Sequence, residues 1–283
     1  FHLRIPRIVM GLLAGAGLSV AGTVMQSITR NPLVSPFTVG ISSAAAFGAS
    51  LAIVFGVGIY THTRFGIVLT AFFFSVLCAA LVYGISSKVG LTPETLILTG
   101  IAVNYLFSAF TATIHFFSKE HQLASAVAWT FGSLNASSWD QVAVIALFVG
   151  ISFPVLFNKS WVFNAMSSNN DDNVKGLGID PSRNRIITGL LSVLLTASII
   201  SFTGVIGFIG LVSPHISRLI IGSDHRYLLP FSVTTGALLV VIADTIGRVI
   251  LLPVMIPVGI VISYIGVPLF INLIITKRKG YFS

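Results

Sequence analysis

The sequence predicts an all-α, polytopic membrane protein, and three observations carry that prediction. Only 8% of the 283 residues are charged and 55% are hydrophobic, whereas a soluble domain carries charge on about a quarter of its residues. The mean hydropathy is +0.97. The hydrophobic residues also gather in runs of roughly 20, the length that an α-helix needs to cross a bilayer. The composition argues against a disulfide-stabilised domain too, because Cys78 is the only cysteine.

Nine such runs are expected to form nine transmembrane helices in this chain. They do not alternate polar and apolar residues at every second position, as the strands of a membrane barrel do. Two helix starts are marked by a capping side chain followed by proline, at Thr92-Pro93 and at Asp180-Pro181. In chain order the runs are 8–28, 39–59, 65–85, 96–117, 142–157, 186–202, 205–221, 228–252 and 254–275.

Small residues are concentrated in the first two runs. Gly11, Gly15 and Gly22 lie in the first run, and residues 42–46 of the second read Ser-Ser-Ala-Ala-Ala. Small side chains allow helix backbones to approach closely. We therefore expect these two runs to pack inside the bundle rather than against lipid.

Laying the helices alternately across the membrane divides the 16 basic residues unequally. Eleven fall on one side: Arg30, Lys88, Lys159, Lys175, Arg183, Arg185, Arg218, Arg226, Lys277, Arg278 and Lys279. Five fall on the other: Arg4, Arg7, Arg64, Lys119 and Arg248. Cytoplasmic loops carry the excess of Lys and Arg, so the C-terminus is predicted to be cytoplasmic. Nine spans then place Phe1 outside, and we expect a tenth, preceding helix in the intact protein.

Two connections are long enough to contain structure of their own. Residues 159–185 form the longest polar segment, predicted to be a cytoplasmic loop with one or two short helices. Asn169-Asn170-Asp171-Asp172 offers caps for such a helix, and Gly176 and Gly178 would end it. Residues 118–140 are predicted to be external, with an interfacial helix. No separate soluble domain is expected, so residues 1–283 form a single transmembrane domain.

A series of short motifs resembles, over essentially the whole chain, the permease subunits of the ABC importers for iron-siderophores, haem and cobalamin. The subunit of that family has ten helices, in agreement with a missing first helix. One departure is Met255, where the family often has Glu. The motifs are Arg4-Ile5-Pro6-Arg7, Gln26 with Arg30-Asn31-Pro32-Leu33, Gly207-Phe208-Ile209-Gly210 before Pro214-His215 and Arg218, Asp224-His225-Arg226, Ala243-Asp244 with Arg248, Pro257-Val258-Gly259, and Gly266-Val267-Pro268.

The resemblance implies a multi-pass permease of the bacterial cytoplasmic membrane that is not itself an enzyme. Its partners would be a second permease subunit, identical or related, two ATPase subunits and an external substrate-binding protein. ATP and Mg would be bound by the ATPase, so no cofactor is expected in this chain, which has no G-x-x-x-x-G-K-S/T phosphate loop. An iron-siderophore chelate is the favoured substrate, with haem and cobalamin as alternatives.

Three arginines at the predicted external surface match family positions that dock the binding protein. These are Arg4, Arg7 and Arg248. Guanidinium groups suit such docking because they form paired, charge-assisted hydrogen bonds with carboxylates. The alternative is that they contact lipid phosphates from the helix ends.

Residues 172–179 resemble the family's coupling helix, which contacts the ATPase. The residues assigned to this role are Asp172, Val174, Gly176, Leu177 and Gly178. Val174 and Leu177, three residues apart on a helix, would present a small apolar surface to a groove of the ATPase. The alternative is a solvated connection without a partner.

The remaining motif residues are predicted to be structural. Asn31 and Pro32 would end the first run and cap the next segment, and Asp244 could pair with Arg248 four residues later. Substrate contact is the alternative for Asp244. Pro214, His215 and Arg218 belong to the seventh run, where a satisfied structural histidine is favoured over a metal ligand. No metal site is predicted.

Other classes of function fit the sequence less well. An ion-coupled secondary transporter would need carboxylates near the midplane and broken helices, but Asp244 is the only acidic residue clearly within a run. An intramembrane enzyme would need a nucleophile and base or paired metal ligands, and no Gly-x-Ser-x-Gly or His-Glu-x-x-His motif occurs. The scattered basic residues argue against nucleic acid as a partner.

Overall fold

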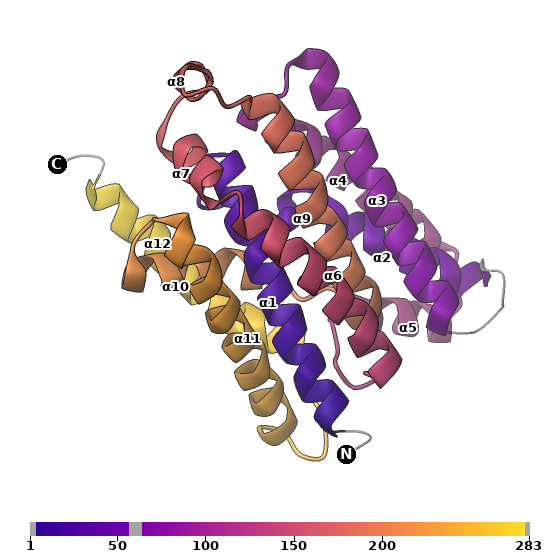
Figure 1. Ribbon diagram of the computed structural model, residues 1–283. Helices are drawn as coiled ribbons and strands as arrows, with labels where there is room; N and C mark the ends of the chain where they lie inside the picture. Colours follow the sequence, from indigo (N-terminus) through magenta and orange to yellow (C-terminus); the bar gives the residue numbers. More distant parts are fainter. Residues whose placement is uncertain (1–3, 57–63, 281–283) are drawn as a thin grey trace.

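The computed structural model describes residues 4–56 and 64–280, and within these ranges it is an all-helical bundle (Figure 1). Six helices are long and apolar enough to cross a membrane: α1 (Arg4–Ile28), α3 (Arg64–Val89), α4 (Pro93–Phe116), α6 (Trp139–Phe157), α9 (Pro181–Thr203) and α11 (His225–Val249). Three further apolar helices are α2 (Ile41–Phe55), α10 (Ile209–Ile221) and α12 (Val258–Gly280). They correspond to the nine predicted runs, so the predicted fold class is confirmed.

Several of the predicted runs extend beyond their helices, most clearly the seventh and the second. The predicted run 205–221 becomes helical only at Ile209, because Phe208 adopts a left-handed conformation with φ 62°. The resulting 13-residue helix is about 20 Å long, which is shorter than the bilayer core. The second run begins with a short 3₁₀ helix, η1 (Pro36–Val39), before α2, and its predicted end at residue 59 lies outside the described residues.

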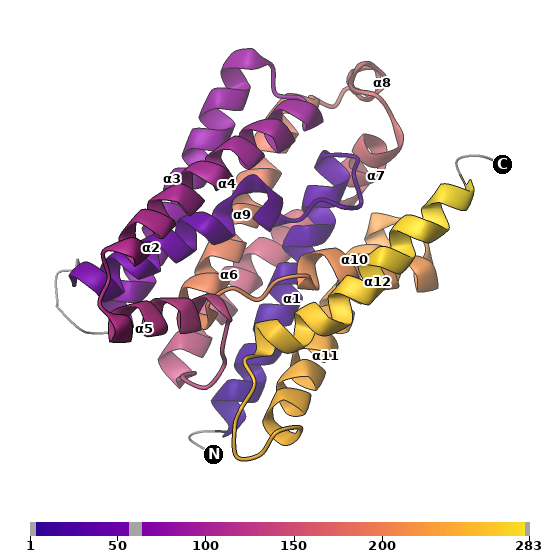
Figure 2. The ribbon, with the colours of Figure 1, turned by 180° about the vertical axis from the view of Figure 1, so that it is seen from behind.

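Helix α1 runs through the centre of the bundle and contacts α6, α9, α10 and α11 (Figures 1 and 2). Small residues make this possible, because a Cβ atom on Gly22 would lie 1.8 Å from the carbonyl oxygen of Gly210. A Cβ atom on Gly15 would likewise lie 2.2 Å from that of Gly236. The backbones of α1, α10 and α11 are therefore in direct contact, and the prediction that the first run packs inside the bundle is confirmed.

The buried helix α9 is rich in hydroxyl groups, which it satisfies within itself. Thr188, Ser192, Thr196, Ser198 and Ser201 are all buried, and each hydroxyl donates to a carbonyl oxygen three or four residues earlier. Such bonds remove the cost of an unpaired polar group in an apolar surrounding. A helix with many Ser and Thr residues can thus lie in the interior without polar partners on neighbouring helices.

The bundle has two distinct ends (Figures 1 and 2). One end carries the short helices α7 (Ser160–Ser168) and α8 (Asp171–Gly176), and we refer to it as the α8 end. The start of α1 and the end of α11 lie at the opposite end, which we call the N-terminal end. Helix α5 (Glu120–Thr130) packs against α2, where Nε2 of Gln122 donates to the carbonyl oxygen of Val54 at 2.9 Å.

Replacing Gly22 with Ala should lower the stability of the protein, because the new methyl group overlaps the backbone of α10. Overpacking of this kind costs about 1–3 kcal/mol. The matched control is Gly84→Ala in α3, where a Cβ atom meets no other atom within 4 Å. The control should be neutral or slightly stabilising, because Ala favours a helix over Gly by about 1 kcal/mol. Thermal unfolding in detergent measures both, and equal stability of the two variants would refute the direct contact.

Candidate functional site

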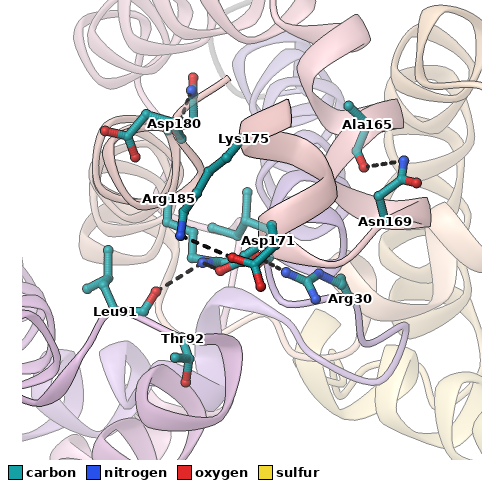
Figure 3. Close-up of polar contacts among 12 residues, drawn as sticks. Arg30, Leu91, Thr92, Ala165, Asn169, Asp171, Lys175, Asp180 and Arg185 are labelled. Atoms are coloured by element: carbon teal, nitrogen blue, oxygen red, sulfur yellow. Dashed lines mark hydrogen bonds and ion pairs between the residues drawn. The ribbon is translucent and has the colours of Figure 1, made fainter. Parts of the chain in front are cut away.

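The buried side chain of Arg185 connects several segments at the α8 end. Arg185 lies in the second turn of α9 and is 0% exposed. Its Nε donates to the carbonyl oxygen of Ile28, the last residue of α1, at 2.9 Å. Its Nη1 donates to the carbonyl oxygen of Leu91 in the α3–α4 connection at 3.0 Å (Figure 3). One side chain thus ties together three segments that are far apart in the sequence.

The same guanidinium group binds the first residue of α8. Nη1 and Nη2 of Arg185 donate to Oδ2 and Oδ1 of Asp171 at 2.8 and 2.7 Å, a paired arrangement. Arg30, just beyond α1, also donates from Nη2 to Oδ1 of Asp171 (Figure 3). We refer to Arg30, Asp171 and Arg185 as the Asp171 cluster. Through it, α8 is attached to α1, α9 and the α3–α4 connection.

The energetics of this cluster explain why a buried arginine is tolerated. A guanidinium group has five N–H donors and no acceptor, and Nε, Nη1 and Nη2 of Arg185 all have partners. Removing one member of such a buried ion pair typically costs about 3–5 kcal/mol, because the other charge is then left without a partner. The cluster is therefore a strong determinant of where α8 lies.

Arg30 itself ends helix α1. The backbone N–H of Arg30 donates to the carbonyl oxygen of Ser27, and that of Asn31 donates to the carbonyl oxygen of Gln26. This is the pattern of a Schellman motif, whose left-handed residue is usually glycine. Arg30 occupies that position with φ 51°, a conformation that costs a residue with a side chain about 1–2 kcal/mol. Glycine would relieve the strain but could not reach Asp171.

The predicted roles of Asn31 and Pro32 need correction. Helix α1 ends at Ile28, so Pro32 lies beyond the end and does not stop the helix. Oδ1 of Asn31 accepts a hydrogen bond from the N–H of Leu33 at 2.9 Å, and it caps a turn rather than a helix. Both residues remain architectural, in the connection that leads to η1.

The predicted coupling residues lie in and just after α8, and one of them does not face outward as expected. Val174 is 0% exposed, because it lies one turn after Asp171 on the face that packs against the bundle. Leu177 follows the helix end and is 64% exposed. The expected apolar surface therefore consists of Leu177 without Val174.

The other coupling residues lie on the exposed side of this segment. Gly176 ends the helix and Gly178 has φ 78°, so the glycines turn the chain back toward α9. The side chain of Asp172 is 94% exposed and pairs with Lys175 at 3.3 Å. Such an exposed pair contributes only about 0.2–1 kcal/mol. Contact of this surface with an ATPase stays a prediction.

Helix α7 is bonded to the start of α11, which is bonded in turn to α1. Nδ2 of Asn164 donates to Oδ1 of Asp224 at 2.9 Å, and Oδ1 of Asn164 accepts from the backbone N–H of His225 at 2.8 Å. The imidazole of His225 lies between Oδ1 of Asn164 at 2.7 Å and Oγ of Ser27 at 2.5 Å. Hydrogen bonds from Arg226 and Asn164 hold the pKa of Asp224 well below its usual range. The two short helices thus contact α1, α9 and α11.

A polar contact joins the seventh predicted run to α1 at this end. Nη2 of Arg218 donates to Oε1 of Gln26 at 3.0 Å, and this contact joins α10 to α1. Pro214 is buried inside α10, and His215 is half-buried beside it. Among the described residues, no group of three or more His, Cys, Asp or Glu side chains is placed to hold a metal ion.

Asp244 joins α1 to α11 at the N-terminal end. Nη2 and Nε of Arg7 donate to its Oδ1 and Oδ2 at 2.7 and 2.9 Å, which ties α1 to α11. Nε of Arg248 lies 3.3 Å from Oδ2, an ion pair at the predicted spacing. Arg7 is therefore occupied by Asp244, and we remove it from the predicted docking residues. Arg4 is exposed, and the side chain of Arg248 is 31% exposed; docking by these two stays a prediction.

Sequence reasoning missed Asp171, Arg185 and Asn164. A signal for Asp171 was present in the sequence. Asp171 and Asp172 are adjacent in the first turn of a short helix, so their carboxylates point in different directions, and one of them can face the bundle. No local signal marks Arg185 or Asn164, since their partners lie up to 157 residues away along the chain.

Known proteins similar to this chain share one function class. The profile of the FecCD transport family matches residues 1–276. A protein of Methanocaldococcus jannaschii, named as an ABC transporter permease, is 40% identical, and the match covers 99% of this chain and 82% of that protein. The Fe(3+)-citrate import system permease protein of Bacillus subtilis is 38% identical over 98% of this chain and 80% of its own length. The cobalamin import system permease protein of Halobacterium salinarum is 37% identical, with coverage of 96% and 72%.

A solved structure agrees with the fold from end to end. It is described as an inward-facing conformation of a metal-chelate type ABC transporter. The two chains superpose with a TM-score of 0.90 and are 35% identical, and the match covers 98% of this chain and 87% of the other.

Replacing Arg185 with Gln should loosen α8 from the bundle, because Asp171 loses its paired donors. We expect trypsin to cleave after Lys175, whose side chain is 62% exposed, at least tenfold faster than in the unaltered protein, which corresponds to about 1.4 kcal/mol. Arg183→Gln, an exposed position two residues away, is the matched control and should leave the cleavage rate unchanged. Equal rates in both variants, each with its helical circular dichroism retained, would show that Arg185 does not hold α8.

Proposed function

The chain belongs to the FecCD transport family and is a permease subunit of an ABC importer, and from this premise we propose that it moves an iron-siderophore chelate across the cytoplasmic membrane. In the proposed assembly two permease subunits form one pathway. Two separate ATPase subunits supply the energy, and an external binding protein supplies the substrate. The C-terminus and the α8 end face the cytoplasm, on the side with the excess of basic residues.

The observation that supports an iron chelate is the similarity to the Fe(3+)-citrate permease protein of Bacillus subtilis, at 38% identity. The metal-chelate type transporter of the solved structure points to the same substrate class. The cobalamin permease of Halobacterium salinarum is almost as similar, at 37% identity. Cobalamin, and with it haem, is therefore the second candidate substrate.

The contacts at the α8 end suggest how movement of the ATPase would reach the membrane helices. A push on α8 acts on Asp171, whose carboxylate is bonded to Arg30 and Arg185. Arg185 in turn holds the carbonyl oxygens of Ile28 and Leu91. Helices α1 and α9 and the α3–α4 connection would thus move together with α8. In parallel, α7 would act on α11 through Asn164.

The distribution of carboxylates favours this mechanism over ion-coupled secondary transport. The eight acidic residues are Glu94, Glu120, Asp140, Asp171, Asp172, Asp180, Asp224 and Asp244. Seven lie in the first turn of a helix or at its N-cap. Asp244 lies within α11, five residues from its end, and is already paired with Arg7 and Arg248. An ion-coupled transporter needs free carboxylates near the midplane.

The substrate class is tested by the binding protein that serves this permease. Its affinity for ferric siderophores, haem and cobalamin is measured by titration calorimetry or fluorescence quenching. Tight binding of a ferric siderophore alone supports the proposed substrate. Tight binding of cobalamin or haem with no affinity for ferric siderophores contradicts it and leaves the importer function intact.

Replacing Leu177 with Asp should uncouple uptake from ATP hydrolysis, because the change puts a charge on the one exposed apolar side chain next to α8. Leu177→Met, which keeps both volume and apolar character, is the matched control. We expect less than a tenth of normal uptake in proteoliposomes for the Asp variant and near-normal uptake for the Met variant. Normal uptake by the Asp variant, assembled with its ATPase, would remove the coupling role from this segment.

Reversing Arg4 and Arg248 together to Glu should abolish docking of the binding protein. One exposed ion pair contributes only about 0.2–1 kcal/mol, but like charges placed opposite each other cost several kcal/mol. Partial rescue is expected when the facing carboxylates of the binding protein are changed to Lys.

The control for this double variant is Lys119→Glu, a charge reversal at an exposed position on the same predicted side. It should leave uptake unchanged. Uptake is measured at low ionic strength, where exposed charges are least screened. Normal uptake by the double variant under these conditions would assign Arg4 and Arg248 to lipid contact instead.

A further inference from the structure

A polar cavity of about 250 Å³ opens at the α8 end of the bundle. It lies where the ends of α1, α7 and α10 meet the start of α11. Its lining combines guanidinium and hydroxyl groups from all four segments: Gln26, Ser27, Arg30, Asn31, Pro32, Ser167, Ser168, Arg218, Ser223 and His225. A cavity of this volume is smaller than the pockets that hold drug-sized ligands, which begin at about 300 Å³. It suits a small ion or a single headgroup.

Arg218 has no carboxylate partner within the described part of the chain, unlike three other arginines at this end. Arg30 and Arg185 are paired with Asp171, and Arg226 is paired with Asp224. Among the described residues, no carboxylate oxygen lies within 4.0 Å of the Arg218 guanidinium. Its single side-chain hydrogen bond goes to the neutral amide oxygen of Gln26. A mostly buried positive charge therefore faces the cavity without an opposite charge.

A second arginine at the cavity has a donor without a partner. Nε of Arg30 is buried and has no hydrogen-bond partner. The hydroxyl groups of Ser168 and Ser223, two exposed residues, also line the cavity. Buried donors are normally satisfied by protein, water or ligand. A negatively charged group with several acceptor oxygens would match both Arg218 and Nε of Arg30.

We propose that this cavity binds an oxyanion, with Arg218 as its counter-charge. The chemical class is a phosphate group, either free or on the headgroup of an anionic lipid. Arg218 and Arg30 supply charge-assisted hydrogen bonds, which are the strong ones for phosphate. Ser168 and Ser223 complete the shell from the end of α7 and the start of α11. The bound group would join the end of the short helix α7 to α1 and α10.

Inorganic phosphate and lipid headgroups are tested separately on the full-length permease. The first arm measures thermal unfolding in detergent with increasing phosphate against chloride at equal ionic strength. The second arm compares the same protein in phosphatidylglycerol and in phosphatidylcholine nanodiscs. A ligand that binds only the folded state raises the unfolding temperature, and we expect a saturable rise of at least about 2 °C in one arm.

Two sets of variants assign the effect to this cavity. Arg218→Gln removes the charge, and the double variant Ser168→Ala with Ser223→Ala removes two hydroxyl groups that line the cavity. The Ser variants should fold normally without ligand, so they keep the test decisive even when Arg218→Gln is unstable. The proposal is supported by a rise that both sets of variants abolish, with phosphate or with phosphatidylglycerol as the source. A rise that persists in the variants, or no rise in either arm, overturns it.

Discussion

The burial of the Arg185 guanidinium group is the constraint on which the arrangement of the α8 end depends. A charge taken out of water must find partners for its donors, or the folded state loses several kcal/mol. Arg185 finds them in two backbone carbonyl groups and one carboxylate, each from a different segment. Because one of those partners is the first residue of α8, the position of this short helix is set by the same side chain that joins α1 to α9.

Helix α1 is held at both of its ends by contacts between guanidinium and carboxylate groups. At the N-terminal end Arg7 binds Asp244 of α11, and at the α8 end Arg30 binds Asp171. Between them, glycines place the α1 backbone directly against α10 and α11. Helices that are packed this closely shift between discrete arrangements rather than deform gradually. A displacement that begins at α8 would therefore be carried along α1 as the movement of a rigid element.

The sequence predicted most of the fold because hydrophobic runs are local signals. It predicted less of the site because the contacts there join residues that are far apart in the chain. Hydrophobic runs were sufficient to find nine apolar helices. The late start of α10 was missed because it depends on a left-handed Phe208, and a phenylalanine carries no such signal. The pairing of Arg7 with Asp244 joins residues 237 positions apart, and the motif suggested instead that Arg7 was free. A short helix was predicted near α8, but Val174 was expected to face outward, and instead it is buried one turn after Asp171.

The contact between Asp171 and Arg185 is central, because it holds α8 to the bundle. A double-mutant cycle tests it directly, with Asp171→Asn, Arg185→Gln and the two combined. The readout is the free energy of local opening from hydrogen exchange of the amides in residues 171–178. Residues in contact show interaction energies of about 0.5–3 kcal/mol. For independent positions, the free-energy effects of the two substitutions add to within about 0.5 kcal/mol. The account predicts an interaction of at least about 1 kcal/mol, within that range, and strictly additive effects would contradict it.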